Sequence, residues 1–303
     1  MAITKPIRDR IKNLRAEFDI LRKGKDSLLA IIDDAEVPES VYNSNAIENS
    51  TLTLRETEKI LLDMEVSRNV SLREVYEAKN LARVIDYIRH KSKESNLNQE
   101  LILLLHQMLI VGIDDAIAGR FRVAGEFVRV GTHVAPAPEK VERMIEVLIT
   151  DYTSNFSDYF LDTIALFHLD FETIHPFCDG NGRIGRILIS FQLQRLGFPM
   201  IIIRDKEKGE YYKSFGDYRT NGNTKRLEKI LALGLMESLH KRITYLKGDT
   251  IITLSEFIKV RSLSASAVTN AARRQNIPAF REKGVWKISE HFEYKGGEKV
   301  EKK

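Results

Sequence analysis

The feature that most constrains the fold of this chain is a run of twelve residues, His175–Arg186, that lies between two apolar periodic segments. Before the run, apolar residues recur at steps of three and four: Ile164, Phe167, Phe171 and Ile174. After its start the same steps appear again: Ile184, Ile187, Leu188 and Phe191. This spacing predicts a helix, a tight loop and a second helix. The polar residues of the run therefore lie on a loop held by two buried helices.

The glycines and arginines of this loop predict a phosphate site. Gly180 and Gly182 allow positive φ and close backbone approach, so that successive N–H groups can point into one concavity at the start of the second helix. Arg183 and Arg186 are three residues apart and lie on one helix face. Their planar guanidinium groups suit bidentate contact with phosphate oxygens, as the far phosphates of a nucleotide would offer.

Two further side chains supply chemistry to such a site. Asp179 is a hard oxygen ligand that could hold Mg²⁺, which usually takes one or two carboxylates together with phosphate oxygens. His175 enters the loop just before it, and a histidine has an ordinary pKa near neutrality. His175 is therefore the natural general base for a hydroxyl nucleophile.

The loop resembles the active-site signature of Fic-domain proteins, His-Pro-Phe-x-(Asp/Glu)-Gly-Asn-Gly-Arg-x-x-Arg, with Cys178 in the variable slot. A plain turn with a buried histidine and surface arginines would explain Gly180 and Phe177 but not the whole set. Three other segments resemble parts of the same family, namely the element before the flap, the flap hairpin and a nucleotide-contacting segment: Gly119–Arg122, Phe127–Val134 and Tyr211–Ser214.

The resemblance implies transfer of AMP from ATP to a Tyr, Ser or Thr hydroxyl of a protein target, with release of pyrophosphate. By position, His175 would deprotonate the target hydroxyl and Asp179 would bind Mg²⁺. The remaining family positions imply ATP contacts, with the α-phosphate at the first three residues and the outer phosphates at the two arginines: Gly180, Asn181, Gly182, Arg183, Arg186, Tyr211 and Tyr212. The phosphorylating branch of the family has a bulkier, lysine-containing loop, so the glycines kept here favour AMP transfer.

An upstream hexapeptide, Ser44–Asn49, resembles the inhibitory motif of Fic proteins, Ser/Thr-x-x-x-Glu-Gly/Asn. The resemblance implies that Glu48 pairs with Arg186 and blocks a productive ATP pose. The alternative is a capping Ser or Asn followed by a solvent-facing glutamate. Whether Glu48 also supports removal of AMP is left open.

The flap sequence offers a surface for the target. Val128 and Val130 alternate with Arg129 in a β-like run before Gly131. A hairpin edge of this kind can pair with an extended target segment.

Composition and spacing exclude several classes of protein. The single cysteine excludes an intramolecular disulfide, and no cluster has zinc spacing. Cys178 is incidental by position, and His168 is expected to be a hydrogen-bonded packing residue. The start lacks a signal-peptide pattern, and the longest apolar run, Leu101–Ile113, is too short for a membrane span. We expect a cytoplasmic protein without membrane contact.

The periodicity predicts an all-α bundle that carries one hairpin, followed by a small C-terminal winged helix-turn-helix. One amphipathic helix is expected over 6–35, closed by Pro38, with a β-like interruption at 126–134. Further helices are expected at about 55–66, 71–91, 98–112, 138–152, 158–174, 183–196 and 225–245. The expected domains are an N-terminal helical region with the inhibitory motif, a Fic core, the winged-helix-like domain and a disordered tail: 1–95, 96–247, 248–294 and 295–303.

The C-terminal segment leaves several partners open. A short helix from Leu254, a turn at Ser262–Ser264, a second helix over Ala265–Gln275 and a β-wing around Gly284 make up the pattern. Its cations could bind DNA phosphates, and homodimerisation or target docking fits as well: Arg273, Arg274, Arg281, Lys283 and Lys287.

Two functions follow from these patterns. The first is an AMP transferase restrained by Glu48, and the second is a non-enzymatic, ATP-sensing, DNA-binding transcriptional regulator. The intact His175 favours the first, because a pure binding protein needs no base there. The sequence identifies neither the target protein nor its modified residue.

Overall fold

The computed structural model describes residues 3–66, 69–155 and 157–294, so the expected disordered tail at 295–303 lies outside the described residues. The chain forms two compact units, and neither is one continuous segment. The first contains Val37–Ala232, and the second contains Lys5–Glu36 together with the residues from Leu233 onward. This division differs from the linear boundaries expected from the sequence, because two long helices each contribute to both units.

The expected single helix over 6–35 is two helices. α1 covers Lys5–Leu21 and α2 covers Asp26–Ile47, with Gly24 at φ +70° between them. Pro38 lies inside α2 and does not close it, although a proline in a helix interior removes a backbone hydrogen bond and costs about 3 kcal/mol. Side-chain contacts hold both halves: Asp33 and Glu36 bind Arg242 in the second unit, and Glu39 binds Arg204 in the first.

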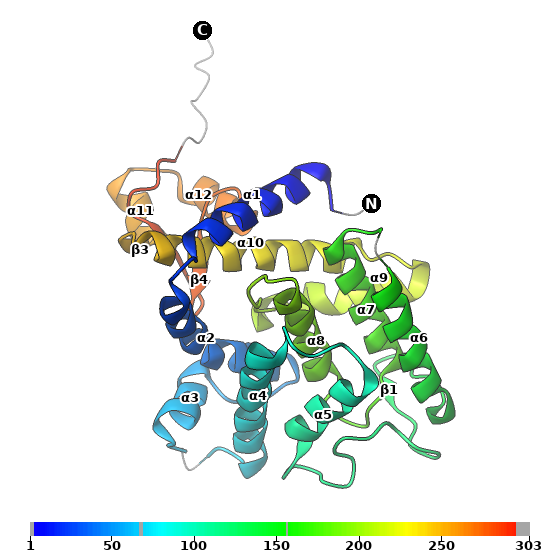
Figure 1. Cartoon of the computed structure of the whole chain (residues 1–303). Helices are drawn as coiled ribbons and strands as arrows, with labels where there is room; N and C mark the ends of the chain where they lie inside the picture. The colour runs from blue at the N-terminus through cyan, green and yellow to red at the C-terminus, as the bar shows by residue number, and fades with distance from the viewer. Residues whose placement is uncertain (1–2, 67–68, 156, 295–303) are drawn as a thin grey trace. The chain divides into compact units, whose positions relative to one another are not determined.

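The first unit is a helical bundle in which the signature loop lies between α7, Phe160–Ile174, and α8, Asn181–Arg195 (Figure 1). Its other regular elements follow in chain order: α3 Leu54–Glu58, a π-helical turn Lys59–Asp63, α4 Leu72–Lys91, α5 Gln99–Ile110, a 3-10 turn Pro138–Lys140, α6 Val141–Ser154, a 3-10 turn Asp205–Glu207 and α9 Lys208–Asn221. Helix α10, Lys225–Lys247, begins in this unit and ends in the second. The spacing analysis predicted most of these helices but not α9.

Local sequence explains where the helices begin. Thr53 and Glu56 form a capping box at α3, and the Ser71 and Asn98 side chains accept backbone N–H groups at the starts of α4 and α5. The predicted apolar face of the helix pair is buried: Ile164, Phe171 and Phe191 are completely inaccessible. Helices α4, α5, α6, α7 and α8 share this core, which holds the loop at their ends.

The predicted hairpin is short. β1, Arg129–Val130, pairs antiparallel with β2, His133–Val134, and Gly131 makes the turn at φ +60°. Arg129 faces Val134 and Val130 faces His133 in this register. Val128 precedes the strand and accepts the Ala135 N–H.

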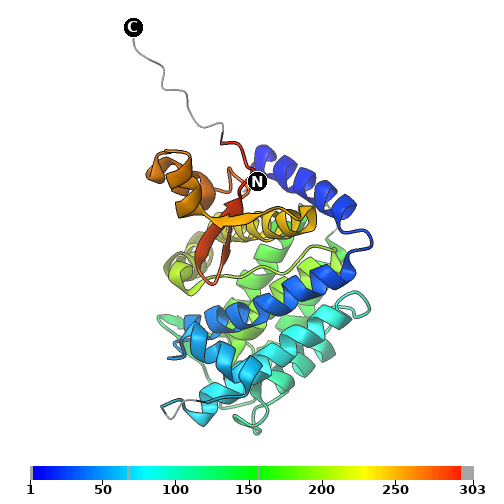
Figure 2. The same ribbon diagram turned by 90° about the vertical axis from the view of Figure 1, so that its left-hand side faces the viewer.

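The second unit contains α11, Leu254–Val260, and α12, Ala265–Arg273, at the predicted positions. The predicted wing is the hairpin β4, Phe280–Glu282, and β5, Val285–Ser289, and it gains a third strand, β3, Ile251–Thr253, in the order β3-β5-β4. Figure 2 shows these strands beside the two short helices. A small apolar core centred on Phe257 and Val268 lies between them.

No helix among the described residues is both long and apolar enough to cross a bilayer.

Candidate functional site

The signature loop is bounded by two residues in the left-handed conformation. His175 ends α7 at φ +50°, and Gly180 begins α8 at φ +83°. A histidine in this region is uncommon and strained, which is typical of functional sites. At Gly180 a Cβ would also press on Leu109, so glycine is required there both for conformation and for space.

Two side chains fix the loop between these residues. The Asn181 side-chain amide accepts the Phe177 N–H and donates to the Phe177 carbonyl oxygen, both at 2.8 Å. This side chain, which was expected to contact the nucleotide, is therefore already used within the loop. His106 stacks on the Phe177 ring with centroids 3.7 Å apart. Its Nδ1 accepts the Gly119 N–H at 3.1 Å, so its Nε2 carries the proton and donates to the Asp179 carbonyl at 3.1 Å. The sequence analysis missed this role of His106, because its position within an apolar helix does not indicate which distant backbone groups it binds.

Arg122 joins the flap to the loop. Its guanidinium is buried and donates to the carbonyl oxygens of His175 at 2.8 Å, Glu126 at 3.0 Å and Pro136 at 3.0 Å. The Arg122 backbone N–H donates to the Pro176 carbonyl oxygen at 3.0 Å. The family-like Gly119–Arg122 segment therefore acts as a structural clamp, and the base of the flap is held against the end of α7.

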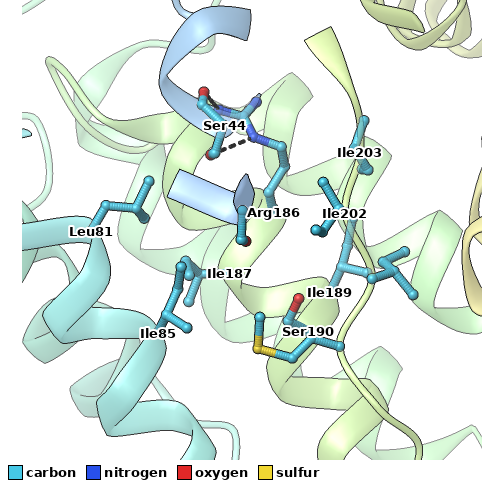
Figure 3. Close-up of a pocket in the computed structure, with 12 residues that line it drawn as sticks. Ser44, Leu81, Ile85, Arg186, Ile187, Ile189, Ser190, Ile202 and Ile203 are labelled. Atoms are coloured by element: carbon cyan, nitrogen blue, oxygen red, sulfur yellow. Dashed lines mark hydrogen bonds between the residues drawn. The ribbon is translucent and has the colours of Figure 1, made fainter. Parts of the chain in front are cut away.

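The predicted contact between Glu48 and Arg186 is present. Arg186 Nη2 donates to Glu48 Oε1 at 2.8 Å and to the Ser44 carbonyl oxygen at 2.8 Å, while Nε donates to Ser44 Oγ at 2.9 Å. Figure 3 shows the Arg186 side chain reaching from α8 to Ser44 at the end of α2. The helix that precedes Glu48 thus binds the guanidinium through both its backbone and its side chains.

Gly182 lies directly under the same carboxylate. A Cβ at this position would overlap Glu48 Oε1 and would approach Arg186 Nη1 to 3.1 Å. The carboxylate therefore covers the first turn of α8, where exposed N–H groups and the helix dipole favour an anion. Arg186 Nη1 remains buried without a hydrogen-bond partner, which leaves one donor for a further anion.

Asp179 is held by cations. Its Oδ2 accepts Arg73 Nη2 at 2.6 Å, and its Oδ1 accepts the Gly180 N–H at 2.6 Å and Arg183 Nη2 at 3.1 Å. Burial alone would raise the pKa of Asp179, but Arg183, the Gly180 N–H and Arg73 outweigh it and lower that pKa. The sequence analysis missed Arg73, which is separated from Asp179 by 106 residues.

The residues fit a metal that takes few protein ligands. The described residues contain no group of three or more His, Cys, Asp and Glu side chains arranged for a metal ion. Asp179 is a single, partly exposed carboxylate at the edge of the anion cradle. This matches Mg²⁺, which retains waters and completes its shell with substrate phosphates.

His175 lies in a sheltered position, with its side chain 14% exposed. Burial lowers the pKa of His175 to about 4, against the opposing effect of the Glu172 carbonyl, so the imidazole is neutral at physiological pH. Its Nδ1 has no hydrogen-bond partner and lies 3.7 Å from Glu172 Oε2. The sequence analysis did not single out Glu172, although the spacing of three residues on a helix could have pointed to it.

The two tyrosines of the segment after the loop differ in position. Tyr211 is completely buried, its hydroxyl is 2.8 Å from His168 Nε2, and its ring lies 5.9 Å from the Arg186 guanidinium. Tyr212 is partly exposed and donates to the Ile47 carbonyl at 2.7 Å, at the end of the helix that leads to Glu48. His168 is the buried packing residue that was predicted, and burial lowers its pKa to about 3.

Cys178 has no activated thiol. Burial, with a contribution from Glu126, raises the pKa of Cys178 to about 11, which suppresses the thiolate. The flap residues Arg129 and Val130 are exposed, as an edge for pairing requires, and Val128 is half-buried.

The C-terminal cations are only partly available for phosphates. Arg281 binds the Glu237 carboxylate through Nε at 3.0 Å and Nη2 at 2.6 Å, and Lys287 binds Glu282 at 2.5 Å. Arg273 and Arg274 are exposed at the end of α12. Two of the five cations expected at DNA are therefore already neutralised by carboxylates.

Comparison with known proteins relates this site to one family. Residues 96–193 match the model of the Fic/DOC family. The protein adenylyltransferase Fic of Nematostella vectensis is 33% identical over 178 residues, which cover 57% of this chain and 41% of the relative. The protein adenylyltransferase fic-1 of Caenorhabditis elegans is 32% identical over 180 residues, which cover 57% of this chain and 35% of the relative. The match thus spans about two fifths or less of these curated relatives.

Solved structures show the same fold. A Fic domain containing signaling protein from Bacteroides thetaiotaomicron superposes with a TM-score of 0.72 at 28% identity, covering 80% of this chain and 98% of that one. Fic-1 of C. elegans superposes with a TM-score of 0.66 at 24% identity, covering 80% of this chain and 71% of that one. The likeness extends well beyond residues 96–193.

Proposed function

This chain carries a Fic/DOC domain, and from that premise we propose that it is a protein adenylyltransferase restrained by Glu48. The relatives at 32–33% identity are named protein adenylyltransferases, which supports the activity. The observation that most supports the proposal is the set of hydrogen bonds made by the Arg186 guanidinium. The guanidinium lies beside the anion cradle of α8 and is bound by Glu48 and Ser44 in place of a phosphate.

The proposed reaction uses the loop as follows. A target hydroxyl oxygen attacks the α-phosphorus of ATP, the bond from that phosphorus to the bridging oxygen breaks, and pyrophosphate leaves. His175 accepts the hydroxyl proton. The backbone N–H groups at Asn181 and Gly182 hold the α-phosphate, and the Gly180 N–H joins them when it leaves Asp179 Oδ1, while Arg183 and Arg186 hold the outer phosphates. The position of the glycines, Asn181 and the two arginines in the first turns of α8 supports the phosphate roles.

Mg²⁺ would be bound by Asp179, where it would neutralise charge on the phosphates of the bound nucleotide. The Arg73 contact to Asp179 Oδ2 competes with such an ion, so Arg73 must release this oxygen first. Tyr212 stays a candidate ATP contact because it is partly exposed. Tyr211 is better assigned to packing behind Arg186, since it is completely buried.

Autoinhibition in this proposal is steric as well as electrostatic. The Glu48 carboxylate covers Gly182 and accepts a hydrogen bond from the Arg186 guanidinium. It therefore blocks both the backbone cradle for the α-phosphate and the arginine contact to an outer phosphate. The Tyr212 hydroxyl donates to the Ile47 carbonyl oxygen and so holds the end of α2, directly before Glu48, in place. Movement of this short segment would open the site without rearrangement of α7 or α8.

The flap is the proposed docking edge for the target. Arg129 and Val130 expose a short strand whose base is fixed to the loop by Arg122. An extended segment paired with this edge would be carried toward His175.

The alternative, an ATP-sensing DNA-binding regulator, has less support. Arg281 and Lys287 are paired with carboxylates, which removes part of the charge that a phosphate backbone would need. We therefore propose that the C-terminal unit contacts protein, either the target or a second copy of the chain.

The test uses ATP labelled at either the α- or the γ-phosphate. The full chain with Glu48→Gly is incubated with Mg²⁺, labelled ATP and a cell lysate, and label is followed into protein. AMP transfer places only the α-label on a protein, whereas phosphorylation places only the γ-label. A variant that binds ATP by calorimetry yet transfers neither label would overturn the proposal and would favour the regulator.

A further inference from the structure

Glu172 is a buried carboxyl group that the proposed reaction does not use. It lies on α7, one helical turn before His175, and is 5% exposed. Its Oε1 has no hydrogen-bond partner, and its Oε2 lies 3.7 Å from His175 Nδ1, which also has none. Leaving a buried polar atom unsatisfied is costly. The two side chains each have one such atom, and they approach one another through Oε2 and Nδ1 beside the proposed base, which points to a functional pair.

The neighbouring helix is built around this carboxyl group. At Gly185 on α8, a Cβ would lie 2.5 Å from Glu172 Oε1 and 2.8 Å from His168 Cε1. Gly185 occupies a variable position of the signature, so the signature itself does not demand glycine there. Any larger residue would push the carboxyl group away from His175.

A competing acceptor lies on the same residue. The Glu172 carbonyl oxygen also acts on the His175 ring, but it already accepts Arg219 Nη2 at 3.1 Å. The carboxylate is the stronger acceptor of the two because it is charged. A shift of the imidazole by a few tenths of an ångström would close the 3.7 Å gap to a hydrogen bond.

We propose that Glu172 is the positioning residue of His175, and that its carboxylate accepts the Nδ1–H so that the Nε2 lone pair faces the target hydroxyl. This assignment rests on the proposed AMP transfer. During the step the hydroxyl proton moves to Nε2, Nδ1 keeps its own proton, and Glu172 stays ionised beside the imidazolium. A histidine held neutral by burial needs such a counter-ion to accept a proton.

The same pair extends the effect of Glu48 to the base. Burial, together with the Glu48 carboxylate, raises the pKa of Glu172 to about 8, while Arg186 on α8 and Arg219 on α9 act in the opposite direction. The other titratable groups around it are His168 on α7, His175 directly after α7 and Tyr211 on α9. A carboxyl group that is protonated while Glu48 is in place would donate to Nδ1 once the 3.7 Å gap closes, instead of accepting a proton from it.

That arrangement disables the base. A proton donated to Nδ1 forces the other imidazole proton onto Nε2, which then has no lone pair for the hydroxyl. Withdrawal of the Glu48 carboxylate removes a like charge, so Glu172 ionises and His175 changes to the Nδ1–H tautomer. Restraint by Glu48 thus acts on the phosphate contacts and on the base together.

The tautomer of His175 tests this without any enzymatic assay. The full chain is labelled with ¹⁵N-histidine, and His175 is assigned by its absence in His175→Ala. We expect Nε2–H in the wild type at pH 6 and Nδ1–H at pH 9, and Nδ1–H already at pH 7 in Glu48→Gly. In Glu172→Gln this pH dependence should vanish, whereas Glu228→Gln, a similarly buried carboxyl group on α10 that Thr224 contacts, should behave as the wild type.

Kinetics provide the second arm. In the Glu48→Gly background, Glu172→Gln should lower kcat about 100-fold with the KM for ATP almost unchanged, and Glu172→Asp should restore part of the loss. An unchanged kcat, or the same tautomer and pH dependence in wild type and Glu172→Gln, would overturn the role of Glu172. If Glu48→Gly itself transfers no AMP, the proposed function fails, while the tautomer measurement still decides the pairing.

Discussion

The signature loop and the C-terminal unit differ in whether their buried polar atoms have hydrogen-bond partners. Around the loop, five groups have a buried polar atom without a hydrogen-bond partner: His168, Glu172, His175, Arg183 and Arg186. Among the described residues from Leu233 to Tyr294, no buried side-chain polar atom lacks one. Since unsatisfied groups are costly, a protein tolerates them where a ligand or a reaction supplies the partner. The contrast supports the proposed reaction at the loop, and it shows that the buried side-chain polar atoms described from Leu233 onward are paired within the protein.

Arg281 illustrates the second case. It binds Glu237 through two nitrogen atoms and lies over the Trp286 ring at 4.7 Å from its centroid. Arg242 likewise binds Asp33, Glu36 and Ser238 within the same unit. Substitutions there should change stability, whereas substitutions at the loop should change chemistry.

The largest effect is expected from His175→Ala. Loss of the base should reduce AMP transfer about 10²- to 10⁴-fold, because the side chain acts on the incoming hydroxyl and not on the phosphates. Affinity for ATP, measured by calorimetry, and the unfolding temperature should stay close to those of the Glu48→Gly parent. Retention of full transfer would show that the base lies elsewhere.

The next effect concerns stability in the C-terminal unit. Arg281→Ala should lower the free energy of unfolding by about 3 kcal/mol, because it leaves the mostly buried Glu237 carboxylate without its cation. Arg273→Ala, at an exposed position, should change it by less than about 0.5 kcal/mol. Denaturant titration measures both. Equal values for the two variants would contradict the contrast between the regions.

Glu48→Gly should raise AMP transfer about 10-fold or more. It frees a charge-assisted contact of Arg186 that is worth about 1.5–3 kcal/mol to the γ-phosphate, and it uncovers Gly182. Glu65→Gly, which removes an exposed carboxylate, is the matched control. Arg186→Ala should show no gain, since it deletes the phosphate contact together with the inhibitor's partner. Wild-type activity in Glu48→Gly would remove the autoinhibition claim.

The smallest effect concerns the metal. In the Glu48→Gly background, Arg73→Ala should lower the Mg²⁺ concentration for half-maximal transfer about two- to fivefold, the range of a partly exposed ion pair. Arg143→Ala, which removes an exposed ion pair on α6, should not. A higher Mg²⁺ requirement in Arg73→Ala would mean that Arg73 assists the ion instead of competing with it. Chelation of Mg²⁺ should stop transfer in every variant.

The helices of the bundle were predictable where apolar spacing is strong, as in α7 and α8. The prediction that Pro38 ends the helix was wrong. The helix continues through Pro38 because Arg242 binds Glu36 before it and Arg204 binds Glu39 after it. α9 was missed because it has little apolar periodicity, and its buried Tyr211 and Ser214 are held by tertiary contacts. Cytoplasmic location and the role of the C-terminal unit stay predictions.

The sequence by itself determined that a polar loop lies between two helices, because the turn-forming glycines and the apolar spacing of the helices depend only on residues close together in the chain. Only the tertiary structure decided that Glu48 covers Gly182, that Arg73 reaches Asp179 and that Asn181 is used by the loop itself. These contacts join residues far apart in the chain or compete for one side chain, so no local pattern contains them. The burial that lowers the pKa of His175 and raises that of Glu172 arises in the same way, since it is a property of the packed helices around them.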